Sequence, residues 1–284
     1  MSTNAHLHLS NFMKPTQPRL VFALDLVAET NAMIRAAFDA RQHVTTEKSA
    51  NDFATETDAA VEALIAERIA AAFPGDTLLG EEGGARALGD APPTGVRWIV
   101  DPIDGTFNFV QGFPYVATSI AVERDGVVEA GVISNPIYGE CFYAERGGGA
   151  WLRIGTDEPR ALTVSRCPQL SKALVGSVLP SAAAKSFDRV LPAWLDVARS
   201  CGSIRRTGAA ALDLAQVAAG RMDGFFVMSL AAWDAAAGAL LVREAGGFVC
   251  DFEGGDKFLE TNQVIAGNAA VSSQLAKVLA PHAT

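Results

Sequence analysis

The sequence has few basic residues, and no run of them interrupts its acidity. It contains 23 Lys and Arg against 32 Asp and Glu, which gives a formal net charge of -9 at pH 7. Nucleic acids and acidic membranes bind proteins through basic surfaces, so direct binding to either is not expected. An acidic protein can still bind a phosphorylated substrate if a multivalent cation lies between its carboxylates and the phosphate oxygens.

Cysteine pairs and long apolar runs are also lacking. The four cysteines are scattered, with no Cys-x-x-Cys pair and no zinc-like spacing, so we expect buried, reduced thiols. No apolar run approaches the ~18 residues of a membrane span, and the N-terminus lacks the basic start and apolar stretch of a signal peptide. These absences predict a cytoplasmic protein with no membrane contact.

The chain does have ample material for a core, because 49% of its 284 residues are hydrophobic. Helical periodicity at 19–40 and 55–72 is followed by short apolar runs separated by turn residues, which predict strands of a meandering sheet. The second half alternates strands and helices, so helices are expected to cover a second sheet. We predict a flexible tail at 1–18, an N-terminal α+β subdomain at 19–160 with most metal ligands, and a C-terminal α/β subdomain at 161–284.

The most informative segment is RWIVDPIDGT at 97–106. An apolar strand runs into Asp101, Pro102 restricts the backbone, and Gly105 permits a tight turn. Asp101 and Asp104 are therefore expected at a strand-end turn where both carboxylates can converge. The backbone N–H groups of Gly105 and Thr106 would then suit a phosphate group. A simple Asx-turn would explain this segment equally well if it stood alone.

Two further acidic segments favour a metal site over a simple Asx-turn. GEEGG at 80–84 follows another short strand, and its glycines leave room for a group to approach the backbone around Glu81. Asp234 begins a helix, as Asp58 does, and helix capping alone would explain either residue. Divalent ions such as Mg²⁺ prefer oxygen ligands. Two such ions ~4 Å apart can stabilise the attacking oxygen and the leaving oxygen of a phosphoryl displacement. The chain offers enough ligands for this: Glu81, Asp101, Asp104, Asp234 and the carbonyl of Ile103.

In combination these motifs resemble the inositol monophosphatase family of lithium-sensitive, metal-dependent phosphatases. The resemblance rests on GEE at 80–82, DPIDGT at 101–106 and WDAAAG at 233–238, and it extends from about Arg19 to the C-terminal helix. The order and spacing of the motifs also fit the family. The implied fold is α+β, a layered α-β-α-β-α sandwich of the inositol monophosphatase and fructose-1,6-bisphosphatase type.

The resemblance also implies roles for individual residues. Two or three Mg²⁺ ions would be held by Glu81, Asp101, Ile103, Asp104 and Asp234. The catalytic residues would be Glu81 and Thr106, which position the attacking water, and Asp58, which supports Thr106. Lys48 matches a basic residue on a mobile loop over the site. Substrate contacts would come from Gly105, Thr106, Gly208, Ala210 and Val227, and the family suggests a homodimer.

The implied activity is Mg²⁺-dependent hydrolysis of a small phosphate monoester by metal-activated water, with inositol monophosphate as the first substrate to consider. Histidinol phosphate, a sugar bisphosphate and a 3′-phosphorylated nucleotide are alternatives within the family, as is an added regulatory binding role like that of some bacterial relatives. Many inositol phosphatases have a Glu seven residues before the Asp of the Trp-Asp motif. This chain has Val227 there, which should weaken selection for a polyol.

Other phosphatase classes fit less well. The haloacid-dehalogenase-like enzymes use Asp-x-Asp, which places both acids on one face of an extended segment, whereas Asp101 and Asp104 are separated by one residue more. A Cys-based phosphatase requires Cys-x5-Arg, and Thr207 stands where the arginine would follow Cys201. A protein with a binding role alone would not need the full set of acids.

Overall fold

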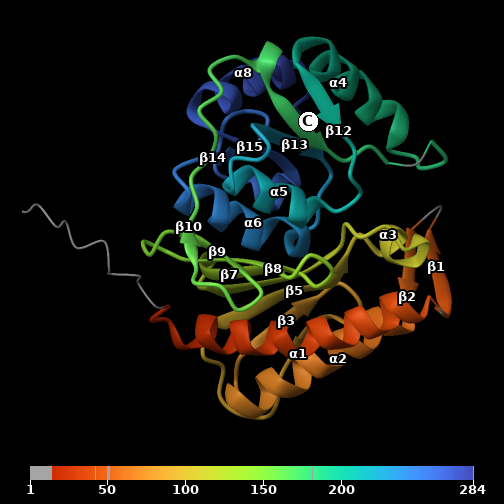
Figure 1. Ribbon diagram of the computed structural model, residues 1–284, viewed down its shortest axis with the longest axis vertical. Helices are drawn as coiled ribbons and strands as arrows, with labels where there is room; N and C mark the ends of the chain where they lie inside the picture. Colours follow the sequence, from red (N-terminus) through yellow and green to blue (C-terminus); the bar gives the residue numbers. More distant parts are fainter. Residues whose placement is uncertain (1–14, 42, 50–51, 181, 284) are drawn as a thin grey trace, which may run out of the picture.

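The computed structural model describes residues 15–41, 43–49, 52–180 and 182–283, arranged in five layers (Figure 1). Two helices form the first layer, an eight-stranded sheet the second, two helices the third, a five-stranded sheet the fourth and two helices the fifth. The expected α-β-α-β-α sandwich is confirmed. Residues 1–14 of the expected tail lie outside the described residues.

The first layer consists of α1 (Pro18–Ala40) and α2 (Glu56–Ala72), which pack against each other and against the large sheet. Pro18 begins α1 at a position where its missing N–H is not needed. Thr55 caps α2, and Asp58 Oδ2 accepts a hydrogen bond from the Thr55 N–H, which completes a capping box. The expected helix start at Asp58 is therefore confirmed.

A buried aspartate ties α1 to the large sheet. Asp76, which is fully buried, accepts hydrogen bonds from Arg19 Nε and Nη2 at 2.8 and 2.9 Å and from Trp98 Nε1 at 2.9 Å. Charge-assisted bonds of this kind satisfy a carboxylate that has lost its water. The start of α1 is thereby fixed beside β5, the strand that carries the acidic motif.

The large sheet has the order β10-β9-β8-β7-β6-β5-β3-β4. All its pairings are antiparallel except β3 with β5. The parallel pair brings the ends of β3 and β5 to the same edge, so Glu81 follows one strand beside the acids of the other. The strands are β3 (Thr77–Gly80), β4 (Gly84–Ala87), β5 (Val96–Asp104), β6 (Ala117–Arg124), β7 (Val127–Asn135), β8 (Glu140–Glu145), β9 (Ala150–Ile154) and β10 (Arg160–Ala161).

The middle layer is formed by α5 (Ala210–Ala218) and α6 (Ala232–Glu244), which pack tightly between the sheets. A Cβ atom built on Gly238 would lie 2.5 Å from Leu214 Cβ, and one on Gly131 of β7 would lie 3.0 Å from Ala237 Cα. Only glycine permits these approaches. The many alanines of α5 and α6 suit this close packing, because their side chains are small.

The smaller sheet has the order β12-β11-β13-β15-β14 and is covered on its outer side by α4 and α8 (Figure 1). The short helix α3 (Thr106–Gln111) directly follows β5. The remaining elements are β1 (Thr45–Ser49), β2 (Asp52–Thr55), β11 (Leu174–Ser177), α4 (Phe187–Ser200), β12 (Ser203–Arg205), β13 (Gly224–Met228), β14 (Phe248–Cys250), α7 (Phe258–Thr261), β15 (Gln263–Gly267) and α8 (Ala269–Leu279). No helix of the described chain is long and apolar enough to cross a membrane.

Candidate active site

Asp101 and Asp104 lie inside β5, and a β-bulge brings them together. Asp101 pairs with Ser119 of β6 and Asp104 with Ala117, so β5 advances three residues while β6 advances two. In a regular strand, residues three apart point to opposite faces, and the extra residue of the bulge corrects this. The two acids were expected in a turn after the strand. The structure instead places them within a strand that continues to Asp104.

Asp104 also holds the N-terminus of α5. Its Oδ1 accepts a hydrogen bond from the Ala210 N–H and its Oδ2 one from the Leu212 N–H, both at 2.9 Å. Ala209, the N-cap residue of α5, has no side-chain oxygen to offer these amides. An acid of the large sheet thus supplies the cap of a helix in the next layer.

Asp234 completes a group of three converging carboxylates. It stands in the first turn of α6, where its Oδ2 accepts a hydrogen bond from the Ala231 N–H at 3.2 Å. One oxygen each of Asp101, Asp104 and Asp234 lie within 4.8 Å of one another. Such an all-oxygen set suits a hard divalent cation.

The electrostatics of this group also suit a cation. Burial, together with the charges of Glu81, Asp104 and Asp234, raises the pKa of Asp101 well above its usual range. Burial and the Asp234 charge likewise raise the pKa of Asp104. Asp101 Oδ1 is buried and has no hydrogen-bond partner within the described residues. A bound cation would relieve the repulsion and satisfy this oxygen.

Glu81 approaches the group from the neighbouring strand. Its backbone N–H donates to the Val100 carbonyl at 3.1 Å, which continues the pairing of β3 with β5 by one residue. Glu81 is outside the set of oxygens within 4.8 Å, yet its charge is close enough to raise the pKa of Asp101. Glu81 therefore lies near the group of three carboxylates without being one of its converging members.

Asp58 and Thr106 are in contact beside the acidic group. Thr106 Oγ1 lies 3.2 Å from Asp58 Oδ1 and 3.1 Å from the Ile103 carbonyl, two acceptors that share its single proton. Burial raises the pKa of Asp58 to about 6, against the opposing effect of hydrogen bonds from Thr55. The structure thus brings Asp58, Ile103 and Thr106 together.

The expected substrate-contact segments also lie side by side. Gly105 has a φ of 89°, and a Cβ there would lie 3.1 Å from the Gly208 carbonyl oxygen. Asn108 of α3 joins the two segments by donating from Nδ2 to the Tyr115 and Thr207 carbonyls, each at 2.9 Å. Sequence analysis missed Asn108, although an amide just after DPIDGT was visible. Ala210 lies next to this junction, with its N–H committed to Asp104.

Val227 does not occupy an open site. It lies on β13, is 1% exposed, and packs in the hydrophobic core with residues of α5 and α6. The expectation that its side chain contacts substrate is therefore corrected. A strand side chain that faces the core has no free surface for a ligand, and a carboxylate placed there would be strongly unfavourable. The side chain of Lys48 lies outside the described residues.

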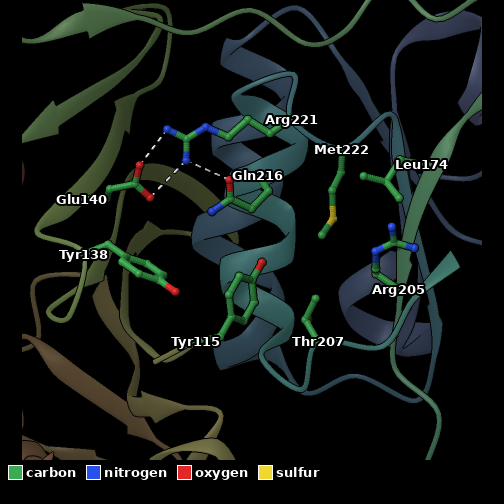
Figure 2. A pocket seen from close by; sticks show the side chains of 9 residues that line it. All are labelled: Tyr115, Tyr138, Glu140, Leu174, Arg205, Thr207, Gln216, Arg221 and Met222. Atoms are coloured by element: carbon green, nitrogen blue, oxygen red, sulfur yellow. Dashed lines mark hydrogen bonds and ion pairs between the residues drawn. The ribbon is translucent and has the colours of Figure 1, made fainter. Parts of the chain in front are cut away.

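A cavity of about 530 Å³ lies along α5 (Figure 2). Arg221 forms two hydrogen bonds with Glu140 across one end and a third with Gln216 Oε1. None of the clustered acids lines the cavity. The lining residues are Tyr115, Tyr138, Glu140, Leu174, Arg205, Thr207, Gln216, Arg221 and Met222. We assign no ligand to it.

Asp213, a second residue that sequence analysis missed, lies behind the cavity wall. It is fully buried, and its Oδ1 accepts hydrogen bonds from Tyr115 Oη at 2.8 Å and Thr207 Oγ1 at 2.7 Å. Its Oδ2 has no partner within the described residues. Burial raises the pKa of Asp213 to about 7. The signal was a lone acid in the helix AALDLAQVA, whose other residues are apolar except for Gln216.

Asp213→Asn should stabilise the metal-free protein increasingly as the pH rises. Because the pKa of Asp213 is about 7 in the folded protein and an aspartate ordinarily has a pKa of 3.8, ionisation disfavours the folded state progressively between these values and fully above pH 7. The gain should reach roughly 1–4 kcal/mol at pH 8 and fade towards pH 4. Urea unfolding in EDTA at several pH values measures it, with Asp157→Asn, an exposed acid, as control. A gain that did not depend on pH would contradict the assignment.

The comparisons with known proteins agree with this geometry. The profile of the inositol monophosphatase family matches residues 16–284. An inositol-1-monophosphatase of Mesorhizobium japonicum is 40% identical over 260 residues, covering 88% of this chain and 95% of the relative. A Nus factor SuhB of Pseudomonas aeruginosa is 39% identical over 269 residues, covering 94% and 97%. The crystal structure of the extragenic suppressor protein suhB from Bartonella henselae has a TM-score of 0.82 at 36% identity, covering 91% and 98%.

The layered fold, the converging acids and these relatives together define a phosphatase. The chain belongs to the inositol monophosphatase family. The resemblance noted from its three motifs is confirmed.

Proposed function

We propose that the protein hydrolyses a small phosphate monoester in a Mg²⁺-dependent reaction. The observation that carries the proposal is the convergence of Asp101, Asp104 and Asp234, two of them buried, around an unpartnered oxygen of Asp101. Burying several carboxylates together is unfavourable unless a cation balances them. Such an arrangement is expected of a metal-binding site, since the capping of α5 by Asp104 and of α6 by Asp234 does not account for the burial of Asp101 beside them.

The donor set fits Mg²⁺, which prefers carboxylate, carbonyl and water oxygens. We infer that Asp101, Asp104, Asp234 and Glu81 hold the metal together with the Ile103 carbonyl. Bound there, Mg²⁺ would supply a water of lowered pKa and would neutralise charge on the phosphate. Glu81 and the Thr106 hydroxyl would orient the attacking water, because Asp58 fixes the position of Thr106 Oγ1.

For the substrate, we propose inositol monophosphate first. The support is the name of the Mesorhizobium japonicum relative and its 40% identity. Gly105 and Gly208 form a close backbone junction near Asp104, where the alcohol portion could be bound. Histidinol phosphate, sugar bisphosphates and 3′-phosphorylated nucleotides stay as alternatives within the family, and the buried Val227 does not distinguish among them.

A second role is favoured by one observation. The Pseudomonas aeruginosa relative is named a Nus factor, and the match covers 97% of its length. We propose that any such role in this chain uses contacts with protein, because a net charge of -9 disfavours unaided binding to nucleic acid. The acids of the candidate metal site would be required for hydrolysis but not for this second role.

Phosphate release from a panel of these esters tests the proposed activity. The purified protein should be active with Mg²⁺, lose activity in EDTA and regain it with excess Mg²⁺, because the metal supplies the activated water. Inhibition by Li⁺ is expected from the family resemblance. Hydrolysis that persisted after complete removal of metal would refute the mechanism.

A further inference from the structure

Helix α2 carries two buried acids on one face. Asp58 is fully buried and Glu62 is 2% exposed, and residues four apart in a helix lie one above the other. Asp58 contacts Thr106 in the candidate active site. Glu62 has no part in the family motifs discussed above, and its burial therefore requires another explanation.

The carboxylate of Glu62 binds the loop that follows β3. Its Oε2 accepts a hydrogen bond from the Glu82 N–H at 2.8 Å, and its Oε1 accepts one from the Gly83 N–H at 2.9 Å. Arg86 of β4 places Nη2 2.9 Å from Oε1 and balances the buried charge. One carboxylate thus fixes two consecutive amides immediately after Glu81.

The glycines of GEEGG make this contact possible. A Cβ on Gly80 would lie 2.4 Å from Glu62 Oε2, and a Cβ on Gly83 would lie 2.8 Å from Oε1. Both distances are shorter than real Cβ contacts allow. The side chain of Glu62, joined at Gly83 by that of Arg86, therefore approaches this backbone and occupies the room that the sequence led us to expect for a ligand.

We propose that Glu62 is a positioning residue that holds Glu81 in its metal-binding orientation. The backbone of Glu81 is fixed at its own N–H by the Val100 carbonyl, and the next two amides are fixed by Glu62. Between these anchors the Glu81 side chain lies near Asp101. Partners of this kind tune metal affinity without touching the ion. The inference rests on the metal site of the proposed function.

Binding of Mn²⁺ alone to the purified full chain tests the inference, with free Mn²⁺ followed by electron paramagnetic resonance. Glu62→Gln keeps the size of the side chain but replaces one acceptor by an amide donor, so it cannot accept both hydrogen bonds. We expect the Mn²⁺ affinity to fall about 10- to 100-fold. Glu62→Asp keeps the charge and is one methylene shorter, so it should act in the same direction. It carries the test if Glu62→Gln does not fold.

Three variants separate positioning from general effects. Glu67→Gln removes the same charge from an exposed position of α2, and Arg86→Gln removes the ion pair but not the amide contacts. Both should remain within about threefold of the wild-type affinity, because the hydrogen bonds from the Glu82 and Gly83 amides to Glu62 stay in place. In a protein that already carries Glu81→Gln, adding Glu62→Gln should lower the Mn²⁺ affinity little further, because Glu62 acts on the metal through Glu81.

The outcomes distinguish this inference from the proposed function. A wild-type protein that binds Mn²⁺ but releases no phosphate from any ester would refute the function and leave the inference intact. Unchanged Mn²⁺ affinity in folded Glu62→Gln or Glu62→Asp would overturn the inference alone. An equal loss in Arg86→Gln, or full additivity with Glu81→Gln, would also overturn it, and absence of Mn²⁺ binding by the wild type would overturn both.

Discussion

Asp101→Asn is expected to lower turnover by at least about 100-fold and, at the same time, to make the metal-free protein more stable. The charge of Asp101 is needed to bind the cation. Without the cation, that charge is buried beside Glu81, Asp104 and Asp234. The asparagine removes the repulsion at nearly constant volume, so the free energy of unfolding in EDTA should rise by roughly 1–3 kcal/mol at pH 8.

The pH dependence gives the sign of this effect a second check. Burial and neighbouring charges raise the folded-state pKa of Asp101, so the folded wild type holds a proton that the unfolded chain releases. Wild-type stability in EDTA should therefore fall as the pH rises from the unfolded towards the folded pKa. The advantage of Asp101→Asn should shrink towards pH 4.

With saturating Mg²⁺ the order of stabilities should reverse, because only the wild type gains the free energy of binding. Asp39→Asn removes the same charge at an exposed position of α1 and serves as the control. Thermal unfolding in EDTA and in Mg²⁺, together with phosphate release, provides the measurements. A less stable Asp101→Asn variant in EDTA at pH 8 would contradict the electrostatic account of the cluster.

The acidic motif shows how far local sequence predicts the site. The apolar run that leads into Asp101, and the Pro and Gly that follow, correctly indicated two converging carboxylates. They did not show that β5 continues to Asp104 through a bulge, because a bulge is defined by its pairing with β6. The residues of one strand alone do not specify that register.

The errors and omissions share a physical cause, since each involves contacts between distant segments. The position of Val227 seven residues before Asp234 does not determine which face of β13 points into the core. Glu62 accepts hydrogen bonds from amides that lie 20 and 21 positions later in the chain. The sequence around an acid in a helix does not indicate such distant partners. Asp213 was visible as an anomaly, but its partners Tyr115 and Thr207 were not.

Among the secondary-structure elements, long periodic segments were predicted best. The helices expected at 19–40 and 55–72 are observed as Pro18–Ala40 and Glu56–Ala72, so each starts within one residue of the expected position and ends at it. The sequence did not predict the six-residue helix α3, the four-residue strand β4 or the β1–β2 pair. The described residues of that pair are mostly polar and lack the alternation that marks a strand, so their pairing with each other defines them.

A comparison of Asp104→Asn with Asp104→Ala separates the role of Asp104 in capping α5 from its role in metal binding. Both variants lose the charge that a metal requires, so both should lose at least about 100-fold in turnover. They differ in capping, because Asp104 accepts hydrogen bonds from the first-turn amides of Ala210 and Leu212. Asparagine retains one side-chain oxygen for these amides, and alanine retains none.

The alanine variant should therefore be less stable than the asparagine variant by about 1–2 kcal/mol in EDTA, the usual effect of losing a helix cap. Both variants relieve the same repulsion within the acidic group, so their difference isolates the cap. Urea unfolding measures it, and hydrogen exchange at the amides of α5 locates it. Equal stabilities of the two variants, with unchanged hydrogen exchange at Ala210 and Leu212, would show that Asp104 does not stabilise the N-terminus of α5.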